Sequence, residues 1–185
     1  MKFYSEWLNL PKKQFELLLR LRLNDNKFEG NKADMCGLMD VTVESSNKDR
    51  IVEAINALTQ SGYITTTHEE NRRNWKLEIV ELDTRSIDYP EEQIKTIMNG
   101  GFSVSVAPVM VVKVLLILIE MDGNQFTQSY LGTEIGCGAG VVRNALQVLL
   151  NDFGAITRQY TYLIDKDVIL RTGTIAEVGA FFNTE

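Results

Sequence analysis

The longest apolar run of the chain, Ala107 to Met121, limits the possible folds more than any other feature. It is fifteen residues long and is interrupted by Lys113. A bilayer-spanning helix needs roughly 20 apolar residues, so the run predicts a buried helix rather than a membrane segment. At 100° per residue its apolar side chains fall on every side of the helix. We therefore expect a helix from Val109 to Met121 that is packed on several faces, with a second chain in a homodimer covering part of it. The alternative is packing within the chain, against the first domain or residues 102–106.

The chain repeats one order of elements on either side of a break between about Asp83 and Ser105. In each copy, apolar residues at helical spacing predict three helices, and runs rich in β-branched residues then predict a hairpin. The first copy has expected helices after Pro11, at about 31–40 and from an N-cap at Ser45 or Ser46 to Gly62, with strands at 63–67 and 75–82. The second has helices at 109–121, from an N-cap at Thr127 to Gly136 and at 139–151, strands at 155–164 and 168–172, and a short tail helix carrying Ile175, Val178 and Phe181.

Superimposing the two halves of the sequence supports an internal repeat, with offsets of 96, 91 and 92 residues for three successive groups. The matched positions are Met35 and Met39 with Leu131 and Ile135, then Ile51, Ala54, Ile55 and Leu58 with Val142, Ala145, Leu146 and Leu149, then Gly62 and Ile64 with Gly154 and Ile156. The order predicts a first domain over 1–84, a linker over 85–106 that includes a short helix at 91–98, and a second domain over 107–185.

The second copy resembles a winged helix-turn-helix domain. The residues that carry the resemblance are Phe126, Thr127, Leu131, Ile135 and Gly136, then Val142, Ala145, Leu146 and Leu149, then Phe153, Gly154, Ala155 and Ile156. The first copy resembles it more loosely, with Met35 in place of the usual Leu and Asp40 in place of the usual Gly. A tandem pair is similar to plasmid replication initiators and phage replisome-organiser proteins. The resemblance implies an α+β fold, mainly α with small β-hairpin wings, in two tandem winged helix-turn-helix domains.

In such domains the third helix enters the major groove, and the wing contacts phosphate or a minor groove. The outward face of the first copy's third helix carries Asp49 and Glu53, which would repel phosphates, with Arg50 at its edge. Lys48 and Arg50 are the candidate DNA-binding residues of this helix. The wing of this copy is better suited to phosphate because it carries a basic cluster of Arg72, Arg73 and Lys76. The alternative is that these side chains only keep an exposed hairpin tip soluble, since Glu69 and Glu70 adjoin them.

The second copy shows the opposite distribution of charge. Its third helix presents Arg143, Asn144 and Gln147, which are side chains that pair with adenine or guanine edges, on a face without acids. Its wing tip, residues 165–167, is acidic. The alternative is that this neutral polar face of the helix is an ordinary solvent-exposed face that contacts no DNA.

The overall charge requires any nucleic-acid contact to be local. The sequence has 19 Lys and Arg against 25 Asp and Glu, a net charge of −6, of which −5 belongs to residues 86–185. We expect a non-enzymatic protein that binds double-stranded DNA in replication initiation or transcription regulation, on a mobile element as the resemblance implies. The alternative is an acidic interaction module that binds protein partners in a replisome, segregation or transcription complex.

Catalytic and metal-binding residues are scarce. The only histidine, His68, has no second ligand nearby in the sequence, and Cys36 and Cys137 stand 101 positions apart. The run from Gly136 to Gly140 has neither a preceding strand nor a following Lys-Ser or Lys-Thr, so it does not match a phosphate-binding loop. We expect no cofactor and no metal, although an enzyme built only from carboxylates stays possible. Two cysteines and a start without a secretory pattern favour a reduced, cytoplasmic protein.

Overall fold

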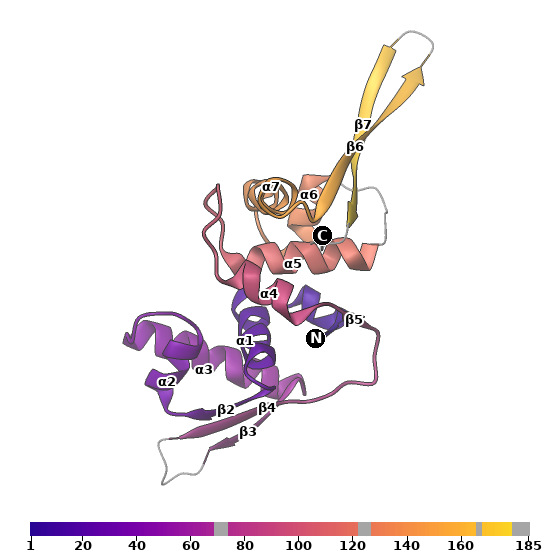
Figure 1. Cartoon of the computed structure of the whole chain (residues 1–185). Helices are drawn as coiled ribbons and strands as arrows, with labels where there is room; N and C mark the ends of the chain where they lie inside the picture. Colours follow the sequence, from indigo (N-terminus) through magenta and orange to yellow (C-terminus); the bar gives the residue numbers. More distant parts are fainter. Residues whose placement is uncertain (69–73, 122–126, 166–167, 179–185) are drawn as a thin grey trace. The chain divides into compact units, whose positions relative to one another are not determined.

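A computed structural model describes residues 1–68, 74–121, 127–165 and 168–178 (Figure 1). The fold is α+β, with helices and small antiparallel sheets. The chain divides into two compact units. The first unit contains Met1 and Leu10–Arg85, and the second contains Lys2–Asn9 and Ser86–Glu185.

The first unit places three helices over one face of a three-stranded sheet (Figure 1). The sheet is antiparallel and has the strand order β2-β4-β3, so the strand between the first two helices pairs with the return strand of the hairpin. Its elements are α1 (Lys12–Leu23), β2 (Lys27–Gly30), α2 (Lys32–Leu38), α3 (Ser45–Gln60), β3 (Ile64–His68) and β4 (Trp75–Ile79).

Apolar periodicity explains the core of this unit. Along β4, Leu77 and Ile79 are buried while Lys76 and Glu78 are exposed, as the alternation of a half-buried strand requires. The buried apolar residues of the helices are Phe15, Leu17, Leu18, Leu19 and Leu21 on α1, Met35 and Cys36 on α2, and Ile51, Ala54, Ile55 and Leu58 on α3. Helical spacing predicts Phe15, Leu18, Leu19 and Leu23 inward in the first helix, and Met35, Leu38 and Met39 inward in the second. All of these are buried except Leu23 and Leu38, which are partly exposed.

The start of α3 differs from the expectation. Ser45 and Ser46 lie inside the first turn, and Glu44 occupies the N-cap without a side-chain hydrogen bond to the helix. The preceding turn is held instead by Asn47, whose Nδ2 donates to the carbonyl oxygen of Thr42 at 3.1 Å. The helix therefore begins one residue earlier than it would with Ser45 as its N-cap.

The second unit combines a short strand pair, a group of helices and a long hairpin. Its elements are β1 (Lys2–Tyr4), the 3-10 helix η1 (Ser5–Asn9), β5 (Ser86–Asp88), α4 (Glu91–Met98), α5 (Pro108–Met121), α6 (Gln128–Ile135), α7 (Ala139–Gln147), the π-helical turn η2 (Val148–Asp152), β6 (Ile156–Asp165) and β7 (Val168–Val178). β1 pairs with β5, and β6 with β7, both antiparallel. The hairpin extends beyond the helices of this unit (Figure 1).

Two segments of this unit differ from the sequence-based prediction. Residues 85–106, expected as a linker with a short helix at 91–98, contain that helix as α4, but they also contain the strand β5, and Ile94 and Ile97 of α4 are completely buried. The expected tail helix is wrong, because Ile175 and Val178 lie in β7, opposite Gln159 and Ile156 of β6. Phe181 lies outside the described residues.

The apolar helix α5 is the centre of the second unit. Every residue from Val109 to Leu118 is buried, and the surrounding elements are η1, α4, α6, α7, β5, η2 and β7. We expected α5 to have neighbours on every side, and the other elements of the second unit are those neighbours. The burial of α5 therefore needs no second chain. Within the described residues, no helix is both long and apolar enough to cross a bilayer.

Candidate nucleic-acid interface

A tight turn joins α6 to α7 and sets the direction of α7. Thr127 caps α6 as expected, since its Oγ1 accepts from the backbone N–H of Tyr130 at 3.1 Å. Gly136 ends α6 with a φ of 70°, a left-handed conformation that glycine adopts without strain. Cys137 N–H then donates to the Gly132 carbonyl oxygen at 2.8 Å. A Cβ at Gly132 would lie 2.7 Å from the carbonyl oxygen of Cys137, so this position has room only for glycine.

Lys113 of α5 makes a buried hydrogen bond to the start of the same turn. Its side chain extends from α5, is 1% exposed, and donates from Nζ to the carbonyl oxygen of Ile135 at 3.3 Å. Ile135 is the last residue of α6, where a positive charge is favoured by the exposed carbonyls of the helix end. Burial lowers the pKa of the Lys113 ammonium and raises the pKa of the half-buried Cys137 thiol.

The titration of Lys113 gives a test of this arrangement. Because burial lowers its pKa, the folded chain releases this proton at a lower pH than the unfolded chain does. Between the two pKa values the unfolded chain binds more protons, so the free energy of unfolding rises with pH. We expect the wild type to gain stability relative to Lys113→Met in urea unfolding as the pH rises through the range just below the pKa of a free lysine, about 10. A difference that stays constant across this range would contradict the burial of a titrating ammonium.

The outward side of α7 is free of acidic residues. We use "α7 surface" for Ala139, Gly140, Val141, Arg143, Asn144 and Gln147. Arg143 is exposed, Asn144 and Gln147 are half-buried, and Val141 is 37% exposed. None of the nine residues of α7 carries a carboxylate, whereas Val142, Ala145 and Leu146 are buried beneath them. The predicted division of α7 into two faces is confirmed.

The chain itself covers one end of the α7 surface. The Asn144 Nδ2 donates to the carbonyl oxygen of Ser105 at 3.0 Å. Ser103 donates from its backbone N–H and its Oγ to the Asp152 carboxylate, at 2.9 Å and 2.7 Å. Residues 103–105 therefore lie along the C-terminal part of α7 and η2. The open part of the α7 surface is its N-terminal half, where Gly138 and Gly140 have no atom within 4 Å of an added Cβ.

The third helix of the first unit presents charges of both signs. Asp49 and Glu53 are exposed, as expected, and Arg50 is exposed beside them. Lys48 is half-buried. Two carboxylates on the outward face of α3 make it a poor surface for a phosphate backbone.

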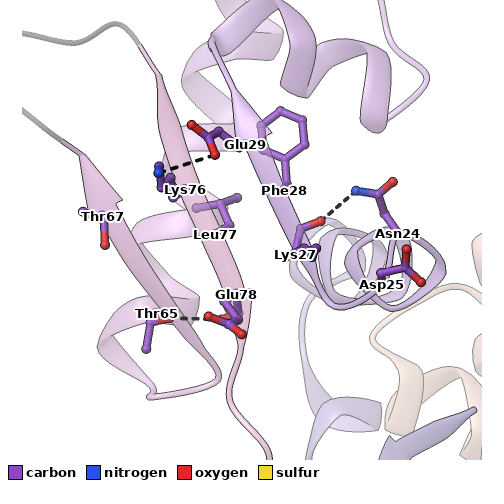
Figure 2. Close-up of a pocket in the computed structure, with 10 residues that line it drawn as sticks. All are labelled: Asn24, Asp25, Lys27, Phe28, Glu29, Thr65, Thr67, Lys76, Leu77 and Glu78. Atoms are coloured by element: carbon purple, nitrogen blue, oxygen red, sulfur yellow. Dashed lines mark hydrogen bonds and ion pairs between the residues drawn. The ribbon is translucent and has the colours of Figure 1, made fainter.

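The hairpin of the first unit was expected to carry the phosphate contacts. Arg72 and Arg73 lie outside the described residues. Lys76 lies on β4 and pairs with Glu29 of β2, with 3.5 Å between Nζ and Oε2 (Figure 2). Both side chains are more than half exposed, so this ion pair contributes little to stability.

The outer face of this sheet carries alternating charges. Lys27 lies opposite Glu78 and Glu29 opposite Lys76 in the register of β2 with β4. A depression of about 470 Å³ lies over this face and extends to Asn24 and Asp25 at the end of α1 (Figure 2). Because its charges alternate, this depression has no uniformly basic surface for a polyanion.

Metal-binding clusters are not found in the described parts of the chain. No group of three His, Cys, Asp or Glu residues there could hold a metal ion. Cys36 is buried, Cys137 is half-buried, and the backbone of His68 lies opposite Trp75 in the sheet. Comparison with protein-family models, curated proteins and solved structures finds no match to this chain.

Proposed function

We propose that this chain is a non-enzymatic protein that binds double-stranded DNA, with the α7 surface as its base-contacting element. The observation that carries the proposal is an exposed helix start without carboxylates, held by a tight turn and bearing Arg143. Small side chains at Ala139 and Gly140 allow the backbone of α7 to approach a groove closely. Arg143 is exposed beside this open half of α7 and supplies the donors that guanine edges accept.

The order of elements supports a winged helix-turn-helix interpretation for both units. In the first, three helices precede a hairpin, and the strand after the first helix pairs with the hairpin's return strand. In the second, α5, α6 and α7 precede the β6–β7 hairpin without such a strand. The role inferred from this resemblance is replication initiation or transcription regulation of a mobile element.

The two units would contribute differently to DNA binding. The exposed acids of α3 disfavour it as a second base reader, so the first unit would contact phosphate through its hairpin. Lys76 and the neighbouring Arg72 and Arg73 are the residues that would make these contacts.

Replacing Arg72, Arg73 and Lys76 with Ala tests the hairpin contribution. We expect weaker duplex binding for every sequence and a salt dependence that is shallower by up to about three phosphate contacts, because phosphate contacts carry no sequence information. Fluorescence anisotropy with labelled duplexes over a salt series measures both quantities. Unchanged affinity and slope would remove this hairpin from the interface.

The second candidate function is a protein-interaction module in a replisome, segregation or transcription complex. The net charge of −6 favours it, because an acidic surface binds basic proteins more readily than DNA. Saturable binding of a protein without any duplex binding at low salt would select this function over the first.

A further inference from the structure

A groove in the second unit, separate from the α7 surface, has the chemistry of a peptide-binding site. It lies between η1, α5 and α6 and has a volume of about 370 Å³. Its lining consists of Ser5, Glu6, Leu8, Asn9, Ile117, Glu120, Met121, Tyr130 and Glu134. Glutamates are the only charged side chains among them, so an occupant of this groove meets apolar surface and negative charge together.

The apolar surface comes from three elements. Leu8 of η1 and Ile117 of α5 are nearly buried at the base, at 4% and 7% exposure. Tyr130 of α6 is 51% exposed, which makes it one of the most exposed large hydrophobic side chains in the described residues. Tyrosine at such a site offers a large contact area with little loss of side-chain entropy.

The wall formed by η1 is anchored by a buried side chain and by a hydrogen bond to α5. Trp7 is completely buried, and its ring meets that of Tyr4 edge to face with 5.1 Å between the ring centres. Ser5 Oγ donates to Glu120 Oε2 at 3.1 Å, which ties η1 to α5 across the groove. A groove with fixed walls needs little ordering when a ligand binds.

The charges identify the class of ligand. Glu6, Glu120 and Glu134 repel phosphates, so a nucleic acid is not a suitable occupant. No cluster suited to a metal ion occurs in the described part of the chain. A lysine or arginine side chain suits the groove because its methylenes can pack on Tyr130 while its charge reaches the glutamates.

We propose that this groove binds a segment of a protein partner in which a lysine or arginine adjoins an apolar side chain. The basic side chain lies over Tyr130 between Glu6 and Glu134, and the apolar neighbour contacts Leu8 and Ile117. This site does not depend on DNA binding by α7. The net charge of −5 over residues 86–185 adds long-range attraction for a basic partner.

Random twelve-residue peptides displayed on phage and selected against the whole chain provide the probe. We expect enrichment of peptides with Lys or Arg beside Leu, Ile, Met or Phe. The enriched peptide, synthesised with a fluorescent label, should bind at least about tenfold more weakly to Tyr130→Ala and to the Glu6→Gln, Glu134→Gln double variant. These residues are exposed, so the variants should fold, and circular dichroism checks this.

The matched control removes two exposed acids away from the groove. Asp49→Asn with Glu53→Gln makes the same change in net charge on α3 and should leave peptide affinity unchanged. Selection of peptides without basic residues would overturn the proposal. So would equal affinity of the groove variants and the wild type, equal losses in the control, or self-association of the wild type that Tyr130→Ala abolishes.

Discussion

Gly132→Ala should lower the free energy of unfolding of the second unit by about 1 to 3 kcal/mol, the range for an added group that a packed site cannot accommodate. The added Cβ would lie 2.7 Å from the carbonyl oxygen of Cys137, which belongs to the turn between α6 and α7. A backbone atom cannot rotate away as a flexible side chain can, so the turn must shift. Since the turn orients α7, duplex affinity should fall with stability.

Gly140→Ala is the matched control for this substitution. Gly140 is also helical, but an added Cβ there has no atom within 4 Å. Alanine favours a helix over glycine by up to about 1 kcal/mol, so this variant should be as stable as the wild type or more so. Thermal and urea unfolding followed by circular dichroism compare the two. Equal stability of Gly132→Ala and Gly140→Ala would show that the turn is not closely packed.

Arg143→Glu should lower duplex affinity at least about tenfold, because it places a carboxylate on the only third-helix surface that has none. Its control is Lys12→Glu, an exposed residue in the first turn of α1 that makes the same change in net charge. Glutamate is favoured near a helix N-terminus, so the control should fold normally. Fluorescence anisotropy titrations with one duplex measure the affinity of both variants. Equal losses of affinity would show that Arg143 acts only through the overall charge of the chain.

Local patterns in the sequence predicted most helices well. Thr127 and Gly136 mark the two ends of α6. The Thr127 side chain caps the helix start, and Gly136 adopts a left-handed φ at the helix end. Residues 91–98 form α4 over the predicted range, and the α5 helix begins one residue before its predicted start. These signals lie within the helix itself or directly beside it, so they do not depend on distant parts of the chain.

Elements that depend on distant partners were not predictable. β1 and β2 have three and four residues, too few to show an alternating pattern, and β1 is paired with β5, which is distant in the sequence. The wrong tail helix has a related cause. Ile175 and Val178 are spaced by three, which suits a helix, but their pairing with β6 makes them part of a strand.

The sequence predicted which face of α7 is buried and which is exposed, but it did not predict the contacts that α7 makes with the rest of the chain. Helical spacing correctly separated buried Val142 and Leu146 from exposed Arg143. The hydrogen bond from Asn144 to Ser105 joins residues 39 positions apart and has no sequence signal. The η1–α5–α6 groove was missed for the same reason, since η1 belongs to the start of the chain and α6 to its second half.

We propose that this acidic chain binds duplex DNA through local contacts. The most direct test of this proposal is a salt series of the whole chain with a random-sequence duplex and with a duplex selected from a random pool. We predict that log K falls linearly with log salt concentration, with a slope between about −2 and −4, and that the selected duplex binds at least about tenfold more tightly. Absence of duplex binding at about 50 mM salt, or equal affinity for the two duplexes, would contradict the account.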